Sequence, residues 1–255
     1  WAMKMVPGYN GHTWAPDIIF YKGKYHLFYS CSTFGKNRSA IGHAENATLN
    51  PSDPRYKWED KGCIVNSVPG RNEWNAIDPN VIVDGDGTPW MTFGSFWNGI
   101  KLVKLTTDMN AVAQPEEWYS LCRRMNNALP DSLPGDDAVE APFIYHHGGY
   151  YYLFVSFDYC CRGMKSNYKI AMGRSQNIKG PYLDRDGKDM LQGGGSILLE
   201  GDHNTYAAVG HCSVYDFSGQ TYLFAHGYEI HDNGMPHLVK RKLKWTADGW
   251  PVVML

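Results

Sequence analysis

The sequence lacks the features that mark several large classes of protein. Its longest apolar runs fall far short of the roughly 20 residues that a membrane-spanning helix requires. No stretch sustains the apolar spacing of an amphipathic helix, and 14 prolines and 27 glycines interrupt the chain throughout. A formal charge of -2 gives no electrostatic reason to bind nucleic acid or an anionic membrane. We therefore expect neither partner, and we expect a fold built from strands.

Cysteine spacing argues against a zinc site, because none of the six cysteines belongs to a C-x-x-C pair. Disulfide pairing stays open on sequence grounds. The adjacent residues Cys160 and Cys161 could form a vicinal disulfide, but we favour two reduced, partly buried thiols.

Aromatic residues, by contrast, are abundant at 14%, with nine Trp and seventeen Tyr. Their flat apolar faces beside polar groups suit the faces and edges of sugar rings. A core rich in β-strands explains the same composition equally well, so aromatic content alone does not predict a carbohydrate ligand.

A hairpin pattern occurs four times, in residues 14–30, 77–95, 139–157 and 210–226. Each copy contains two runs rich in β-branched and aromatic residues around a turn. Pro16, Pro79 and Pro142 are equally spaced at the starts of three copies, and Cys212 takes that place in the fourth. The chain therefore contains an internal structural repeat.

Further strand candidates follow each hairpin. The third strands are expected at residues 39–44, 100–105, 168–173 and 237–243, and fourth strands at residues including 57–62, 180–184 and 249–253. Four antiparallel strands repeated at a fixed period are typical of a β-propeller, whereas a β-sandwich would not explain the period. We predict an all-β propeller that forms a single domain over residues 1–255.

The residues just before each first strand are the strongest site candidates. In a propeller these positions converge near the central axis, so we expect Trp14, Asp17, Asp78, Glu140 and His211 to line one pocket. Three carboxylates and a histidine are costly to desolvate together unless they bind or catalyse something. Other histidines, such as those at positions 26 and 43, are interpreted as surface or satisfied core residues.

These residues stand in motifs that closely resemble the endo-α-1,5-L-arabinanases of glycoside hydrolase family 43. The motifs are HTWAPDI (12–18), NAIDPNVIVD (75–84), GSFWNGIKL (94–102), EAPFI (140–144), SFDYCCRGMKSNYKIAMGRS (156–175), GPYLDRDGK (180–188), GGGS (193–196) and VGHCSV (209–214). The match covers essentially the whole chain. It implies a five-bladed propeller that hydrolyses α-1,5-linked arabinofuranose chains (arabinan or arabino-oligosaccharide) with inversion.

The resemblance also implies residue roles. Inversion uses two carboxyl groups roughly 6.5–9.5 Å apart on opposite faces of the sugar. Glu140 resembles the general acid, and Asp78 resembles the carboxylate that orients this acid and keeps its pKa raised. His211 resembles an axial histidine that faces a calcium or sodium ion through water.

Substrate contacts are expected from loops beside the same pocket. We expect Trp97 to be exposed and to stack on a sugar, with packing between blades as the alternative. Polar groups that begin at Asp158 would hydrogen-bond arabinose hydroxyls. The predicted substrate-binding residues are Trp14, Asp17, Ser95, Phe96, Trp97, Asn98, Asp158, Cys160 and Cys161.

One part of the family pattern has no counterpart here. The general base is the Asp of a His-Asp-Pro motif in the first blade, and this chain contains no such motif before Trp14. Asp17 is in the expected pocket but belongs to a substrate-binding motif, so we disfavour it as a substitute. We expect about four of five blades here, with an N-terminal segment missing and no signal peptide in view.

The absent base leaves alternatives open. The chain could be a catalytically inert carbohydrate-binding propeller, or an exo-arabinanase or xylosidase of the same family. A polymeric substrate cannot enter a cell, which favours a secreted or periplasmic bacterial protein.

Overall fold

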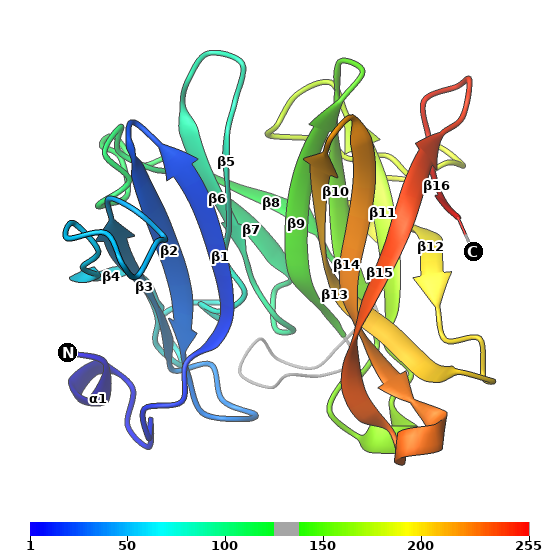
Figure 1. The fold of residues 1–255 in the computed structure, drawn as a ribbon, viewed down its shortest axis with the longest axis horizontal. Helices are drawn as coiled ribbons and strands as arrows, with labels where there is room; N and C mark the ends of the chain where they lie inside the picture. The colour runs from blue at the N-terminus through cyan, green and yellow to red at the C-terminus, as the bar shows by residue number, and fades with distance from the viewer. Residues whose placement is uncertain (125–137, 255) are drawn as a thin grey trace. The chain divides into compact units, whose positions relative to one another are not determined.

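The computed structural model describes residues 1–124 and 138–254, and within them the strands form four antiparallel sheets of four strands each (Figure 1). Neighbouring strands in every sheet are consecutive in the chain. The described residues fall into two compact units, residues 1–120 and residues 121–124 together with 138–254. The all-β class is confirmed, and each sheet has the form of a propeller blade. The single domain and the fifth blade stay predictions.

Unit 1 holds the first two sheets, except for the last two residues of β8, which belong to unit 2. One contains β1 (Trp14–Tyr21), β2 (Lys24–Cys31), β3 (Ser39–Asn46) and β4 (Glu59–Ser67). The other contains β5 (Asn80–Val83), β6 (Pro89–Phe93), β7 (Ile100–Lys104) and β8 (Trp118–Cys122). Buried side chains from both sheets form one core, among them Phe28, Ile41, Met91 and Phe93. Burying each such side chain contributes about 1.5–3 kcal/mol, so this core holds the two sheets together.

Unit 2 repeats this arrangement. Its first sheet contains β9 (Val139–His147), β10 (Tyr150–Phe157), β11 (Lys169–Ser175) and β12 (Ser196–Glu200). Its second contains β13 (Tyr206–Phe217), β14 (Gln220–Glu229), β15 (Met235–Trp245) and β16 (Pro251–Met254). The shared core includes Phe143, Phe154, Met172, Val214 and Leu223. All four predicted hairpins are thus confirmed.

Helices are scarce in the described part of the chain, as expected. They are α1 (Ala2–Met5) and the 3-10 turns η1 (Gly163–Lys165), η2 (Met190–Gln192) and η3 (Ile230–Asp232). None of these is long and apolar enough to cross a membrane.

One strand prediction is wrong. Residues 180–184 do not form the fourth strand of the third sheet, because that strand is β12, further along the chain. Asp184 explains the difference: its Oδ1 accepts hydrogen bonds from the N–H groups of Asp186 (3.0 Å) and Lys188 (2.9 Å). Its Oδ2 accepts another from Gly195 N–H at 2.9 Å. A side chain that bonds its own backbone in this way stabilises a turn, so the strand forms only after it.

A backbone kink marks the start of every sheet. The residue before each aligned proline, or before Cys212, has a positive φ: 44° at Ala15, 58° at Asp78, 53° at Ala141 and 54° at His211. Such values are uncommon outside glycine and are frequent at functional sites. In three of the sheets the strand register also shifts close to the kink. Bulges of this kind re-aim side chains, here at the positions where the sequence predicts a site.

Candidate active site

Glu140 lies near the start of β9, half-buried and opposite Ser156 of β10. Its Oε1 accepts a hydrogen bond of 2.6 Å from the hydroxyl of Tyr168, a side chain with only 1% of its surface exposed. The predicted acid therefore has a partner whose position is fixed by burial.

His211 lies in the same unit, on β13. Its backbone N–H donates a 2.7 Å hydrogen bond to Ser156 Oγ, so a single serine is opposite Glu140 and is bonded to His211. Burial lowers the pKa of the His211 ring, and the nearby Glu140 carboxylate acts in the opposite direction. The ring stacks on His226, with 5.3 Å between ring centroids. The structure thus brings Glu140 and His211 into one electrostatic environment.

Asp158 begins the loop that follows β10, with φ of 67°. Its carboxylate forms ion pairs with Arg124 Nη1 at 3.1 Å and with Lys169 Nζ at 3.0 Å. The Arg124 guanidinium also lies 4.1 Å from the centre of the Phe157 ring. Asp158 therefore holds two cations beside the predicted substrate loop, and its own contact with substrate stays a prediction.

The cysteine expectation is wrong, because Cys160 and Cys161 form a vicinal disulfide. The Tyr228 hydroxyl accepts a 3.0 Å hydrogen bond from Cys161 N–H, and Cys160 packs on the apolar cluster that contains Tyr168 and Tyr228. The fold thus holds the disulfide in place, whereas the sequence showed only that the two cysteines are adjacent.

Asp78 in unit 1 is positioned like His211 in unit 2, through a backbone hydrogen bond to a serine hydroxyl. It is buried, and its N–H donates a 3.0 Å hydrogen bond to Ser30 Oγ. Trp14, half-buried at the start of β1, lies opposite Ser30. Ser30 and Ser156 each follow an aligned phenylalanine by two residues, a signal in the repeat that sequence reasoning missed. The convergence of Asp78 with Glu140 and His211 stays a prediction.

Asp17 is buried and has structural contacts. Its Oδ2 accepts hydrogen bonds from Val81 N–H at 2.8 Å and from Asn80 Nδ2 at 3.2 Å. These bonds join β1 to β5, the first strand of the neighbouring sheet. Asp17 therefore ties the two sheets of unit 1 together, and its predicted substrate contact is untested.

The loop after β6 differs from expectation at Trp97, which is not exposed: only 6% of its surface is accessible. Phe96 and Trp97 both have positive φ, and Gly99 N–H donates back to Phe96 O at 2.8 Å, which folds the loop tightly. Asn98 donates to Glu73 through its backbone and its side chain, and Ser95 is buried. Burial favours packing as the role of Trp97, and the substrate contacts of this loop stay predictions.

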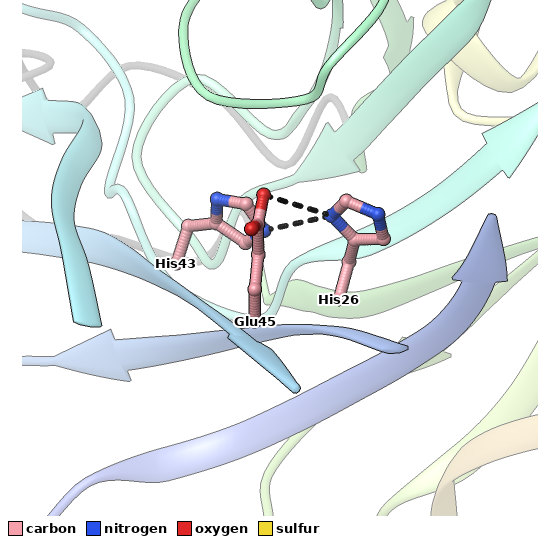
Figure 2. Close-up of side chains that lie close together, drawn as sticks. All are labelled: His26, His43 and Glu45. Atoms are coloured by element: carbon pink, nitrogen blue, oxygen red, sulfur yellow. Dashed lines mark hydrogen bonds and ion pairs between the residues drawn. The ribbon is translucent and has the colours of Figure 1, made fainter. Parts of the chain in front are cut away.

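Three other ionisable side chains cluster in unit 1, on β2 and β3. Figure 2 shows His26, His43 and Glu45 pointing toward one another, with His26 Nδ1 3.1 Å from His43 Nε2 and 3.8 Å from Glu45 Oε1. Their ligand types could hold a metal ion. However, Glu45 Oε2 already lies 2.7 Å from Lys24 Nζ and 3.5 Å from Lys61 Nζ, cations that would repel a dication. We therefore interpret the cluster as a buried network of core side chains. The prediction of a satisfied core histidine holds for His26, whereas His43 Nδ1 is buried without a hydrogen-bond partner among the described residues.

The four-stranded antiparallel sheets have the form of propeller blades, and each begins at a kinked residue. Three of the four kinked residues are ionisable or directly follow an ionisable residue. The chain belongs to the glycosyl hydrolases family 43, whose family model matches residues 2–251. The resemblance seen in the motifs is thereby confirmed.

Relatives support the assignment over nearly the full chain. An extracellular exo-α-(1->5)-L-arabinofuranosidase of Cellvibrio japonicus is 49% identical over 99% of this chain and 73% of its own length. An extracellular endo-α-(1->5)-L-arabinanase of Bacillus subtilis is 45% identical over 98% of this chain and 72% of its own. The structure of a Cellvibrio cellulosa α-L-arabinanase complexed with arabinohexaose matches with a TM-score of 0.97 and 48% identity, covering 100% of this chain and 81% of that one.

Proposed function

We propose that this chain is a glycoside hydrolase that cleaves α-1,5-linked L-arabinofuranose chains with inversion. The observation that carries the proposal is its 45–49% identity, over nearly its whole length, to enzymes named for that linkage. Because one of these relatives is named as exo-acting and the other as endo-acting, the mode is the finer part of the proposal, and we favour endo cleavage.

In this mechanism Glu140 is the general acid. It gives its proton to the oxygen of the leaving sugar as the bond from that oxygen to the anomeric carbon breaks, and the bonding electrons stay with the oxygen. Water attacks the opposite face and loses a proton to the general base, a role that we assign to no residue of this sequence. Asp78 orients the acid and keeps it protonated through like-charge repulsion. The half-buried position of Glu140 and its bond to Tyr168 suit a fixed proton donor.

Substrate binding is proposed for the accessible members of the predicted set. Trp14, Phe96, Asn98, Asp158 and Cys160 are half-buried, and Cys161 is exposed, so each presents some surface to a ligand. An arabinanase of very similar structure is described as a complex with arabinohexaose, which supports an oligosaccharide ligand for this site. A carbohydrate-binding propeller without catalysis, or a xylosidase of the same family, is the alternative.

A calcium or sodium ion near His211 belongs to the same proposal. Calcium takes oxygen ligands, so a lone imidazole suits an ion held through its water shell rather than directly. When bound, the ion would supply positive charge beside the reacting sugar. Since both named relatives are extracellular, we also propose export, which detection in the culture medium or periplasm would test.

Reducing-sugar release from debranched arabinan tests the proposal, with this chain assayed alone and joined to a preceding segment that carries a His-Asp-Pro motif. We expect Glu140→Gln to lower the rate on arabinan by about 10²–10⁴-fold and to spare an aryl arabinoside whose leaving group needs little protonation. A chelator should slow the reaction without unfolding if calcium is bound. Binding of arabino-oligosaccharide with no release in either form would favour the non-catalytic alternative.

A further inference from the structure

The Tyr168 side chain carries an inference that rests on the proposed acid role of Glu140. We propose that Tyr168 is a positioning residue, whose hydroxyl holds the Glu140 carboxyl in the orientation needed for proton delivery. The two side chains are joined by the 2.6 Å hydrogen bond from the Tyr168 hydroxyl to Glu140 Oε1. Short bonds to a carboxyl oxygen are among the stronger hydrogen bonds in proteins, so this one can fix the side chain that accepts it.

Packing holds Tyr168 rigid. It precedes β11, its carbonyl oxygen accepts a 3.1 Å hydrogen bond from Val209 N–H, and its ring is buried against Ala207, Ala208 and Tyr228. Each of these contacts lies within unit 2. A phenol confined in this way has few alternative rotamers, so its hydroxyl marks a fixed point in space.

Gly210 makes room for the ring. A methyl group at position 210 would overlap Cδ1 and Cε1 of Tyr168, so the ring occupies the volume that a side chain would otherwise fill. Gly210 directly precedes His211 on β13. The same short segment therefore supplies the predicted axial histidine and the space through which Tyr168 reaches Glu140.

The chemistry gives the contact a purpose. A protonated carboxyl has one O–H donor, and its other oxygen remains an acceptor. With Oε1 accepting from Tyr168, the proton that Glu140 delivers is carried by Oε2, which the hydrogen bond keeps in one orientation. His211 and Tyr228 also interact electrostatically with Glu140, but in the described structure the bond to Oε1 comes from Tyr168.

Tyr168→Phe tests this role, because it keeps the ring and removes only the hydroxyl. We expect kcat on arabinan to fall about 10–100-fold with KM nearly unchanged, since a misplaced acid loses orientation rather than binding. The rate on an aryl arabino-oligosaccharide with a good leaving group should stay within about twofold, because that reaction needs little proton donation. Added to Glu140→Gln, the Tyr168 change should have no further effect on either substrate.

Tyr182→Phe is the matched control. Tyr182 is also fully buried in unit 2, but its hydroxyl donates to Ile178 O at 2.9 Å. The Tyr182→Phe variant should be less stable than the wild type, but the ratio of its rates on arabinan and on the aryl arabino-oligosaccharide should be unchanged. Equal losses on both substrates for Tyr168→Phe, or the same ratio change in Tyr182→Phe, would overturn the proposal.

A double-mutant cycle of unfolding separates this inference from the proposed function. Non-additive effects of Tyr168→Phe and Glu140→Ala on stability would confirm the contact whether or not the protein cleaves arabinan, because alanine removes the acceptor oxygen that glutamine would keep. If the stability effects are non-additive but Glu140→Gln still cleaves arabinan at the wild-type rate, the general-acid role of Glu140 is refuted. A clear acid phenotype with additive stabilities would instead refute the role of Tyr168.

Discussion

The first sheets of the two units place different residues at corresponding points of the same framework. In unit 1, His26 pairs with Glu45 and Phe28 pairs with His43 across β2 and β3. In unit 2 the corresponding pairs across β10 and β11 are Tyr152 with Arg174 and Phe154 with Met172. One unit thus has an ionisable His-His-Glu network at positions where the other has a phenol, a thioether and a guanidinium.

Each set contacts its own neighbours, although His43 Nδ1 is buried with no hydrogen-bond partner in the part of the chain that the structure describes. The histidines bond each other, and Glu45 pairs with Lys24. In unit 2 the Tyr152 hydroxyl donates to Gly249 O, and Arg174 lies over the Trp250 ring and donates to Asp248 O at 2.7 Å. The two sheets thus share the same strand register, while the side chains at corresponding positions differ in chemistry. The shared register also supports a structural role for the His26 network, because its positions are packing positions in the other unit.

The largest expected effect is a pH dependence to which the histidine network contributes through His43, as His226 of unit 2 also does. Burial lowers the pKa of His43 to about 4, from an ordinary value of 6.5. Between these values the unfolded chain binds more protons than the folded one. The free energy of unfolding should therefore fall as pH drops from 6.5 to 4, by up to about 3 kcal/mol for this group. Denaturant unfolding across this range would measure the slope.

His43→Met, which introduces the residue found at the corresponding position of unit 2, should flatten that slope. Met172→Leu is the control, because it changes core packing in unit 2 without removing an ionisable group. Equal slopes in wild type and His43→Met would contradict the assignment. Hydrogen exchange in β3 should report the same pH dependence in the wild type and a weaker one in His43→Met.

A smaller loss is expected at Asp17, which follows Pro16 as Phe143 follows Pro142. Asp17 ties its sheet to the next through Val81 N–H, whereas Phe143 packs edge-on against Tyr215 at 5.5 Å. Asp17→Ala leaves a buried N–H without its acceptor and should cost about 2 kcal/mol of stability. Asp17→Asn, which keeps one acceptor oxygen, should cost less. If Asp17→Ala unfolds at the same temperature as the wild type, the carboxylate does not stabilise the contact between the two sheets.

The smallest expected losses of stability are at Ser30 and Ser156, which make the same contact in the two units. Each hydroxyl accepts from the kinked residue of the next sheet, Asp78 or His211. Ser30→Ala and Ser156→Ala should each lower the free energy of unfolding by about 1 kcal/mol, the usual worth of such a bond. Paired chemical denaturation would measure both, and a loss in only one unit would mean that the shared contact is not equally important.

The sequence predicted correctly the elements that belong to the regularly spaced repeat. The spacing of Pro16, Pro79 and Pro142 was enough to predict the hairpins, and the motifs were enough to identify the family. Sequence-based prediction failed at Asp184, whose side chain bonds nearby backbone and closes a turn instead of ending a strand. It also failed at Trp97, which is buried in a tightly folded loop.

The site itself was only partly predictable. Glu140 and His211 were singled out by their places in the repeat, and unit 2 brings them into one environment. Tyr168 was not identified, because its contact with Glu140 depends on a ring that crosses the space left by Gly210. Both Tyr168 and Gly210 begin segments that the repeat predicts as strands, but no one-dimensional signal showed that the Tyr168 ring packs over Gly210.

The kinked positions have a practical consequence for mutagenesis. At two of the four, Ala15 and Ala141, the chain already places alanine in the left-handed conformation. Alanine can therefore adopt the positive φ of these positions. Ala15 and Ala141 show this within the same protein. Replacing Asp78 or His211 by alanine should then report on the missing carboxylate or imidazole, whereas a β-branched replacement would add backbone strain to the measurement.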